Sequence, residues 1–189
     1  MVGSICLITG GARSGKSGFA EKLCSERGRK IGYIATAEAM DEGMIERIKR
    51  HQERRPDSWE TFEIQQNIHN VLHEKSAEEF DILLLDCLTV LTTNIMLSDL
   101  SIDWDTVPRD QINDIEKTVL SQLEELINAV KETGHNLIVV TNEVGLGIVP
   151  ENRLARLFRD IAGKANELMA SHATEVHFVV SGIPMKIKG

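Results

Sequence analysis

Cysteine is scarce in this sequence of 189 residues and follows no pattern. Cys6, Cys24 and Cys87 are odd in number, lie far apart and show no C-x-x-C spacing. The sequence therefore predicts neither a disulfide framework nor a zinc site. We expect reduced, mostly buried cysteines, as in a cytoplasmic protein.

Long apolar runs are also missing. No segment approaches the roughly 20 apolar residues of a membrane span. The N-terminus lacks a basic start followed by a long apolar segment, so a secretion signal is not expected. There is no internal repeat and no low-complexity linker, so we expect a single domain over residues 1–189, long enough to bury a sizeable core.

Positive charge is in the minority. The chain has 21 Lys and Arg against 29 Asp and Glu, which gives a formal net charge of -8. This balance argues against a general surface for nucleic acid or acidic membranes. The hydrophobic content of 42% with 26% charged residues is ordinary for a globular protein.

Strand-like and helix-like segments alternate along the chain. Residues 81–86 form a continuous apolar run of the kind buried on both faces of a parallel sheet. Residues 109–133 carry apolar side chains on one helical stripe. The alternation implies βαβ crossovers, so we expect an α/β fold with a mostly parallel central sheet and helices on both faces. Strands are predicted at 4–9, 30–36, 59–64, 81–86, 136–141, 175–181 and 184–188, and helices at 18–27, 41–55, 67–79, 109–133 and 152–171.

The first strand is followed by a phosphate-binding motif. Gly10, Gly15, Lys16 and Ser17 match G-x-x-x-x-G-K-[ST] where a strand turns into a helix, which is the context that a P-loop requires. The glycines let backbone N–H groups converge on a triphosphate, Lys16 would neutralise the β- and γ-phosphates, and the Ser17 hydroxyl would bind Mg²⁺. The alternative is a glycine-rich turn that matches by chance. The predicted phosphate contacts are Gly10, Gly11, Ala12, Arg13, Ser14, Gly15, Lys16 and Ser17.

Asp86 ends the apolar run 81–86. The carboxyl ends of parallel strands face the ligand crevice. A carboxylate there is placed to hold Mg²⁺ beside Ser17, directly or through water. The alternative role is to cap the next helix.

A basic segment at residues 47–55 interrupts the acidic chain. It carries five basic residues against one acidic residue, and His51 lies four residues after Arg47, on the same helix face. Such a run is normally a solvated helix face. Because a polyphosphate ligand is already predicted, a cluster of Arg donors could bind it. His51 could then be a nucleophile that carries a phosphoryl or nucleotidyl group, or it could only bind phosphate.

Weaker features have plain structural explanations. His69 and His73 have metal-ligand spacing but no third ligand in pattern, so a surface helix is favoured. His135, His172 and His177 have nothing predicted to converge on them. The D-x-x-G match at 160–163 falls inside a predicted helix and is read as accidental. No N-K-x-D motif occurs, which argues against a switch GTPase while leaving GTP open as a substrate.

Two connecting segments leave alternatives open. Residues 98–108 form a polar loop with Trp104, for which a surface excursion is favoured over a role in binding substrate or another subunit. Residues 141–150 (TNEVGLGIVP) follow a strand, and Gly145 and Gly147 permit an unusual backbone path there. Asn142 and Glu143 could meet substrate or nucleotide, or the segment could be a tight connection.

These segments together resemble one family, the bifunctional adenosylcobinamide kinases/adenosylcobinamide-phosphate guanylyltransferases of cobalamin biosynthesis. The resemblance rests on TGGARSGKS (9–17), YIAT (33–36), the basic segment with His51, DCLT (86–89), TNEVGLGIVP (141–150), NRLARLFRDIAG (152–163) and SGIPMKIK (181–188). It spans nearly the whole chain. One departure is residues 90–92, where the family often has a Trp-containing stretch; this leaves the surface that contacts the corrinoid undefined.

The resemblance implies a three-layer, RecA-like P-loop fold and two successive reactions. ATP or GTP would phosphorylate adenosylcobinamide with Mg²⁺, and GMP from GTP would then be placed on that phosphate through guanylylated His51. It also implies a homo-oligomer, with a trimer as one form. A P-loop small-molecule kinase without nucleotidyl transfer and a RecA-type ATPase or switch are the alternatives. Beyond the P-loop and Asp86, the nucleotide-binding residues expected are Ala35, Thr36, Ala37, Gln52, Glu53, Arg54, Arg55 and Glu63, with His51 and Lys16 as the catalytic pair.

Overall fold

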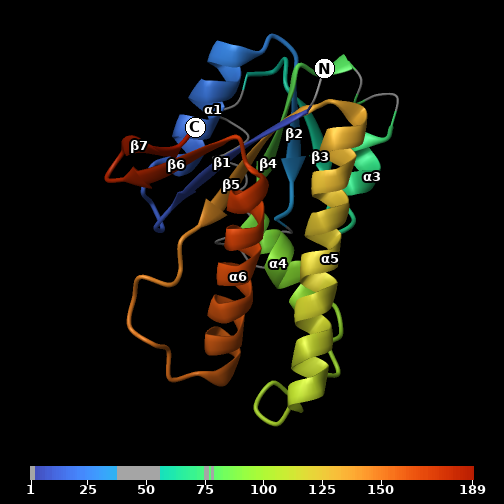
Figure 1. Ribbon diagram of the computed structural model, residues 1–189, viewed down its shortest axis with the longest axis vertical. Helices are drawn as coiled ribbons and strands as arrows, with labels where there is room; N and C mark the ends of the chain where they lie inside the picture. The colour runs from blue at the N-terminus through green and yellow to red at the C-terminus, as the bar shows by residue number, and fades with distance from the viewer. Residues whose placement is uncertain (1–2, 38–55, 75–76, 78) are drawn as a thin grey trace.

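A seven-stranded sheet forms the centre of the protein (Figure 1). The computed structural model describes residues 3–37, 56–74, 77 and 79–189. The strands lie in the order β3-β2-β4-β5-β1-β6-β7, and neighbours are parallel except for β7, which pairs antiparallel with β6. The bounds are β1 Ser4–Gly10, β2 Ile31–Ala35, β3 Glu60–Glu63, β4 Ile82–Asp86, β5 Asn136–Asn142, β6 Glu175–Val180 and β7 Ile183–Lys188.

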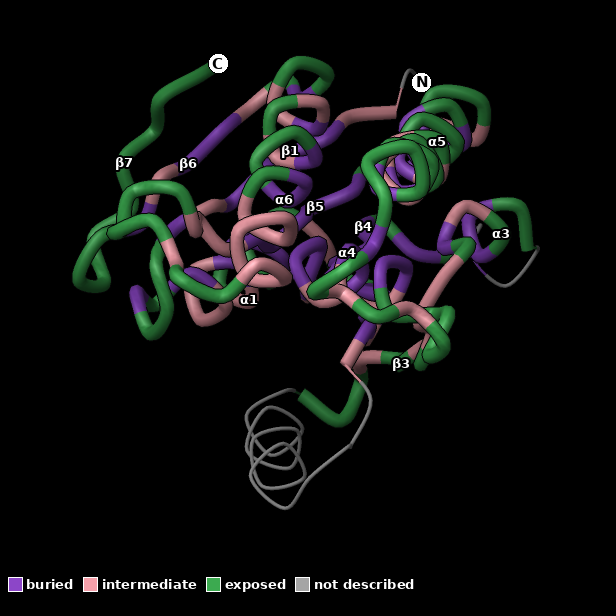
Figure 2. The backbone as a smooth tube through the Cα atoms, turned by 90° about the horizontal axis from the view of Figure 1, so that it is seen from below, coloured by how far each residue is buried: buried purple, intermediate pink, exposed green. Residues whose placement is uncertain are grey.

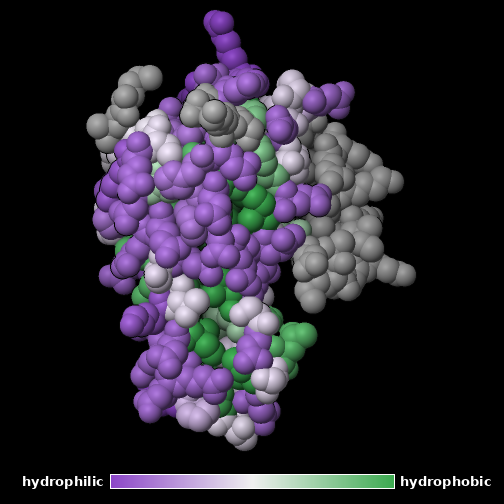
Figure 3. All heavy atoms as spheres, turned by 90° about the vertical axis from the view of Figure 1, so that its right-hand side faces the viewer, coloured by the Kyte–Doolittle hydropathy of each residue, from purple (hydrophilic) through white to green (hydrophobic). Residues whose placement is uncertain are grey.

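Helices cover both faces of this sheet and make three layers, which confirms the predicted α/β architecture. Helix α1 packs on one face, and α4, α5 and α6 pack on the other (Figures 1 and 2). Helix α5 presents a largely hydrophilic surface outward (Figure 3). None of the described helices is long and apolar enough to cross a membrane. The bounds are α1 Lys16–Arg27, α3 His69–Leu72, α4 Leu88–Met96, α5 Arg109–Thr133 and α6 Arg153–His172.

The central strands are buried because their side chains are apolar on both faces. Leu83 and Leu85 of β4 point into the core under α4 and α5, whereas Ile82 and Leu84 pack under α1. Alternate side chains of a strand point to opposite faces of the sheet. Asp86, two residues after Leu84, therefore lies on the face that α1 covers, at the carboxyl end of β4.

Local signals in the sequence locate the two long helices well. Helix α5 has the predicted bounds and ends at Gly134, whose φ of 77° is the left-handed conformation that glycine adopts without a steric penalty. Helix α6 begins after Asn152, whose side chain accepts a hydrogen bond from the Ala155 amide. The D-x-x-G match falls inside α6, as expected. The helix predicted at 41–55 lies outside the described residues.

One helix prediction was wrong and one helix was not predicted. Among the described residues of the helix predicted at 67–79, only the short α3 is α-helical, and it is preceded by Asn67 with a φ of 54°. Helix α4 was not predicted. It is buried on several sides, with Thr89 and Thr92 buried among leucines, so it lacks the polar stripe that marks a surface helix.

The loop at 98–108 is a largely exposed surface excursion that is anchored to the fold. Trp104 packs against the larger core cluster and Val107 is buried. The Arg153 guanidinium donates hydrogen bonds to the carbonyl oxygens of Trp104 (3.1 Å), Asp105 (2.6 Å) and Val107 (2.7 Å). The first residue of α6 therefore holds this loop in place. Most of its residues are exposed, so the predicted surface excursion is confirmed.

Two histidines have partners that the sequence did not indicate. His135 contacts the Thr133 hydroxyl (2.7 Å) and the Ala77 carbonyl (2.9 Å). His177 lies 2.7 Å from Glu175, which also receives a two-pronged ion pair from Arg27 at 2.8 and 3.0 Å. The expectation that nothing converges on these histidines was therefore wrong: one partner of each lies two residues away along the chain, and folding brings Ala77 to His135 and Arg27 to Glu175.

The three cysteines are free and buried, as predicted. Burial is the main cause that raises the pKa of Cys6 and Cys24 to about 12. Cys6 lies with Glu175 and His177 in a group whose potential ligand atoms are within 4.8 Å of one another. The Arg27 guanidinium already pairs with Glu175 there, so we interpret the cluster as a partly exposed ion pair beside a buried thiol.

Candidate nucleotide-binding site

The loop between β1 and α1 has the backbone shape that phosphate binding requires. Gly15 has a φ of 93° and Arg13 a φ of 58°, both in the left-handed region. A Cβ atom on Gly10 would lie 2.4 Å from the carbonyl oxygen of Val179, so only glycine allows β1 and β6 to approach so closely here. No side chain caps the N-terminus of α1, whose first-turn N–H groups face the loop.

Lys16 lies inside this loop. Its side chain is buried, at 6% exposure, and its ammonium donates a 3.1 Å hydrogen bond to the Gly11 carbonyl. The Ser14 amide donates to the same carbonyl at 3.2 Å. The buried hydroxyls of Ser14 and Thr9 have no hydrogen-bond partner among the described residues. The Ser14 hydroxyl, just before the N-terminus of α1, is suited to an anion. Thr9 alternates with Leu7 along β1, so its hydroxyl lies on the other face of the sheet.

The turn between β6 and β7 packs on the P-loop. The sequence did not predict this contact. The Gly182 amide donates a 2.8 Å hydrogen bond to the Ser14 carbonyl. A Cβ atom on Gly15 would lie 3.1 Å from the Gly182 Cα. Ser181 and Gly182 both have positive φ, at 50° and 82°. The Ser-Gly pair was the available signal, since it is typical of a tight hairpin turn, but only the fold places that turn against the P-loop.

Asp86 lies at the same edge of the sheet as the loop. In the strand register Asp86 is level with Val140 of β5, and Val140 is level with Ile8 of β1. Two strand spacings, about 10 Å, separate β4 from β1. Cys87, not Asp86, occupies the N-cap position of α4, and the Cys87 side chain makes no capping hydrogen bond. The helix-cap alternative for Asp86 therefore has no support.

The strand end at Asp86 is bordered by a phenol and by a buried thiol. The hydroxyl of buried Tyr33 donates a 3.1 Å hydrogen bond to Asp86 Oδ2. Burial raises the pKa of the Cys87 thiol to about 11; the negative charge of Asp86 adds to this rise and the positive charge of Lys16 opposes it. Lys16 and Asp86 therefore both act on the space beside Cys87. Ser17, at half-buried exposure, is in the first turn of α1 above it.

Ala35, Thr36 and Ala37 lie at the end of β2, beside Asp86. Ala35 is level with Asp86 in the register. The fully buried Thr36 uses its hydroxyl to donate to the Cys87 carbonyl (3.0 Å) and to accept from the Cys87 amide (2.9 Å). This hydroxyl fixes the two strand ends to each other. Contact of these three residues with nucleotide stays a prediction.

Glu63 is placed farther from the loop. It ends the edge strand β3, level with Ala35, and β3 stands four strand positions from β1, roughly 19 Å away. Glu63 therefore shares an edge of the sheet with the P-loop without being adjacent to it. The remaining predicted residues lie outside the described part of the chain: His51, Gln52, Glu53, Arg54 and Arg55.

A polar network at the end of β5 was also missed. The Thr89 hydroxyl lies 3.2 Å from that of Thr141 and accepts a 2.7 Å hydrogen bond from the Asn142 amide. Asn166 of α6 accepts from Thr141 (2.6 Å) and donates to the Asn142 carbonyl (3.0 Å). This network connects α4, β5 and α6. Asn166 gave no sequence signal, because it stands in an ordinary amphipathic helix.

The strand–loop–helix geometry, the buried lysine and the aspartate two strands away define a P-loop nucleotide-binding protein of the RecA-like class. The flagellar accessory protein FlaH from Methanocaldococcus jannaschii has a similar fold, with a TM-score of 0.54 and 16% sequence identity over 99% of this chain and 79% of that chain. This likeness concerns the fold alone.

Comparison of sequences defines the family. The chain belongs to the cobinamide kinase / cobinamide phosphate guanyltransferase family, whose model matches residues 6–187. It is 42% identical to the bifunctional adenosylcobalamin biosynthesis protein CobU of Escherichia coli over 96% of this chain and 98% of that protein. The CobU protein of Salmonella typhimurium is also 42% identical, over the same shares. The CobP protein of Pseudomonas aeruginosa is 40% identical over 97% of this chain and 96% of its own length.

Proposed function

We propose that this chain phosphorylates adenosylcobinamide from a nucleoside triphosphate and then transfers GMP from GTP to the product. The observation that carries the proposal is the P-loop with buried Lys16, at the same sheet edge as Asp86, in a chain that belongs to this family. The family description supplies the two activities. The geometry of the described residues supports the first of them.

The kinase step needs a held triphosphate and an aligned hydroxyl. The acceptor oxygen attacks the γ-phosphorus, the bond to the β–γ bridging oxygen breaks, and the nucleoside diphosphate leaves. The protein contributes mainly positioning and charge. The backbone N–H groups of the loop would bind the phosphates, and Lys16 would move from the Gly11 carbonyl to the β- and γ-phosphate oxygens.

Mg²⁺ is part of this proposal. The Ser17 hydroxyl and the Asp86 carboxylate are the oxygen ligands that this cation prefers. Both lie on the α1 side of the sheet, one in the first turn of the helix and one at the end of β4. A bound Mg²⁺ would offset the negative charge of the phosphates. ATP or GTP is the proposed phosphoryl donor.

The guanylyl step is assigned to His51. Its imidazole nitrogen bonds to the α-phosphorus of GTP while the bond to the α–β bridging oxygen breaks and pyrophosphate leaves. A phosphate oxygen of adenosylcobinamide phosphate then attacks the same phosphorus, the P–N bond breaks, and adenosylcobinamide-GDP is released. This divides one difficult transfer into two easier ones. The support for His51 is its place in the basic segment 47–55 and the family membership of the chain.

The remaining expectations belong to the same proposal. Ala35, Thr36, Ala37, Glu63 and the segment 52–55 would complete nucleotide binding, the chain would act as a single domain, and the enzyme would be a cytoplasmic homo-oligomer, with a trimer as one form. Light scattering measures the oligomeric state directly.

Product analysis tests the function. The protein is incubated with adenosylcobinamide, Mg²⁺ and either ATP alone or ATP plus GTP, and the corrinoids are identified by mass spectrometry. ATP alone should give the phosphate, and added GTP should give the GDP derivative. A kinase without nucleotidyl transfer would stop at the phosphate. An ATPase or switch would hydrolyse nucleotide without changing the corrinoid, and that result would overturn the proposal.

A further inference from the structure

The segment between β5 and α6 exposes several large apolar side chains. Leu146, Ile148 and Val149 are 80%, 97% and 59% exposed. In Figure 1 this segment, residues 143–151, runs from the end of β5 to the start of α6 and stands apart from that helix. Grouped exposed apolar side chains on a folded protein indicate a surface that meets a ligand or a partner. We call residues 146–149 the apolar loop.

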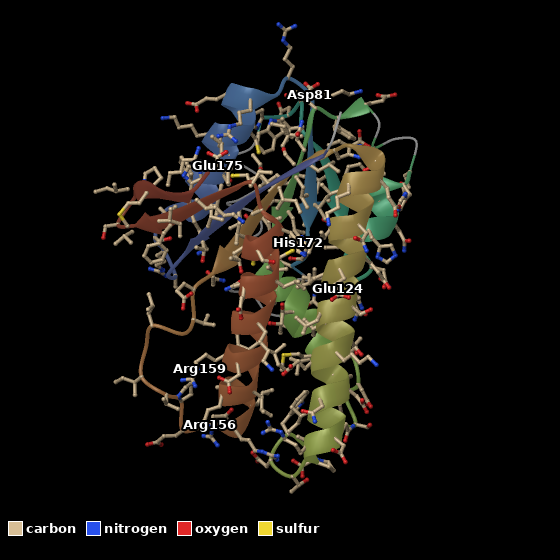
Figure 4. All side chains as sticks on the ribbon, in the orientation of Figure 1. Asp81, Glu124, Arg156, Arg159, His172 and Glu175 are labelled. Carbon is tan, nitrogen blue, oxygen red and sulfur yellow. The ribbon has the colours of Figure 1, made fainter. Side chains whose placement is uncertain are left out.

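Both ends of the apolar loop are fixed to the fold. At its start, the Glu143 amide donates a 3.0 Å hydrogen bond to the Gly10 carbonyl of the P-loop. At its end, the Arg156 guanidinium donates to the carbonyl oxygens of Pro150, at 3.0 Å, and Glu151. Figure 4 shows Arg156 at the lower end of α6. The loop is therefore an exposed apolar tip held on an anchored base.

The base of the loop stands where the γ-phosphate would lie. Strand β5 runs between β1, which leads into the P-loop, and β4, which ends at Asp86. Ser17 and Asp86 would hold the cation that offsets the phosphate charge. Because Asp86 lies across β5 from the P-loop, the terminal phosphate would lie on the β5 side of the P-loop. Asn142, the last residue of β5, is level with Gly10. The hydroxyl that accepts the phosphoryl group must reach this place.

We propose that the apolar loop binds the corrin macrocycle of the kinase acceptor, next to the γ-phosphate. The inference rests on the proposed function and adds the position of the acceptor. A corrin ring is large and carries many methyl groups on its edge, so it offers apolar surface of the kind that Leu146, Ile148 and Val149 would cover. A nucleoside triphosphate has no comparable surface, and its phosphates belong in the P-loop on the other side of Glu143.

Steady-state kinetic constants for adenosylcobinamide and for ATP test this proposal. The double variant Leu146→Ser/Ile148→Ser is compared with Ile187→Ser, a control on β7 that is 63% exposed in the wild type. The double variant should raise the KM for adenosylcobinamide at least about tenfold, from the apolar area no longer buried, and leave the KM for ATP unchanged. The control should change neither constant. An unchanged acceptor KM in an active double variant overturns the inference.

A second measurement does not depend on turnover. The substitution Ile148→Cys adds an exposed thiol, whereas the native thiols are buried and have raised pKa values, so they react slowly with maleimide. Adenosylcobinamide should protect Cys at position 148 from modification, and ATP alone should not. Modification that is unaffected by the corrinoid but slowed by raising the protein concentration would show that a second copy of the chain covers the loop, and would overturn the inference. A wild type that fails to phosphorylate adenosylcobinamide would instead refute the proposed function.

Discussion

Tyr33 and Asp86 come from neighbouring strands and meet through a 3.1 Å hydrogen bond from the phenol to Oδ2. Tyr33 is only 4% exposed, so its ring is fixed by packing and its hydroxyl holds the carboxylate at the strand end. A carboxylate held in one orientation is a better cation ligand than a rotating one. The YIAT segment thus contributes to the site through a side chain that does not need to touch nucleotide.

The substitution Tyr33→Phe tests this positioning role. The ring still fills the core, but the charged Asp86 carboxylate loses the hydrogen bond that the Tyr33 hydroxyl donates. We expect the Mg²⁺ concentration for half-maximal kinase activity to rise about threefold to tenfold, from roughly 1 kcal/mol of lost orientation. Activity at saturating Mg²⁺ should be nearly normal. An equal loss of activity at every Mg²⁺ concentration would indicate a structural effect only.

Asp86→Asn should have a larger effect of the same kind. The amide keeps the shape of the side chain and removes its charge, while the N–H groups of the P-loop remain. The Mg²⁺ requirement should rise at least about tenfold, and nucleotide binding without Mg²⁺ should change little. Activity measured across a Mg²⁺ titration, alongside nucleotide binding in EDTA, checks both. If activity falls by one factor at limiting and saturating Mg²⁺, Asp86 is not the metal ligand.

Lys16→Ala should reduce phosphoryl transfer at least about a hundredfold, because catalysis in such sites is mainly electrostatic. Lys22→Ala is the matched control: Lys22 is on the same helix, with its side chain 72% exposed in an ion pair with Glu26. The control should be fully active. Circular dichroism shows whether both variants fold. A folded Lys16→Ala protein with normal turnover would contradict the proposed role of the P-loop.

His51→Asn should eliminate guanylyl transfer and spare much of the kinase step. Incubation of the wild type with GTP labelled at the α-phosphate should give a protein adduct that acid destroys and alkali does not, in the peptide that contains His51. The exposed His172, replaced in His172→Asn, is the control and should label normally. Label on another residue would refute the intermediate. Loss of both activities would mean that residue 51 also supports the kinase step.

The lowered pKa of Glu175 allows a prediction of how the stability of the protein depends on pH. The hydrogen bond from Arg27 is the main cause that lowers the pKa of Glu175 from 4.5 to about 2. A carboxyl group whose pKa is lowered by folding stabilises the protein above its unfolded pKa and loses that contribution as the pH falls toward the folded value. The wild type should therefore lose stability between about pH 4.5 and pH 2.

Denaturant unfolding of Glu175→Gln at several pH values measures this contribution. The variant should be less stable than the wild type at pH 7, and the difference should shrink as the pH approaches 2. Glu26→Gln is the control, because the Glu26 side chain is 57% exposed and its ion pair is on the surface. A difference between Glu175→Gln and the wild type that is constant with pH would exclude the ion pair as its cause.

The core of the site could be predicted from sequence because its signals are local. A P-loop is one continuous segment in which strand, glycines, lysine and helix follow one another, so the spacing of Gly10, Gly15 and Lys16 is enough. Asp86 could be predicted because it ends a conspicuous apolar strand. Helices α5 and α6 carry regular stripes and end signals, and their bounds were found within one residue or better.

The parts that were missed depend on contacts between distant segments. Helix α4 has no polar stripe because α5, α6 and the sheet surround it. Gly182 meets Ser14 only because β6 and β7 pair beside β1, and Asn166 meets Thr141 only because α6 packs over β5.

The sequence by itself determined the class of fold, the phosphate-binding segment, the strand-end aspartate and the family resemblance, because each of these lies in a short stretch whose residue types and spacing have a direct physical meaning. Only the tertiary structure decided which neighbours surround that segment: the β6–β7 turn and the Glu143 amide on the P-loop, and Tyr33 on Asp86 at the same edge of the sheet. These relationships arise from strand order and helix packing, in which many weak contacts far apart along the chain act together, and no local pattern records them.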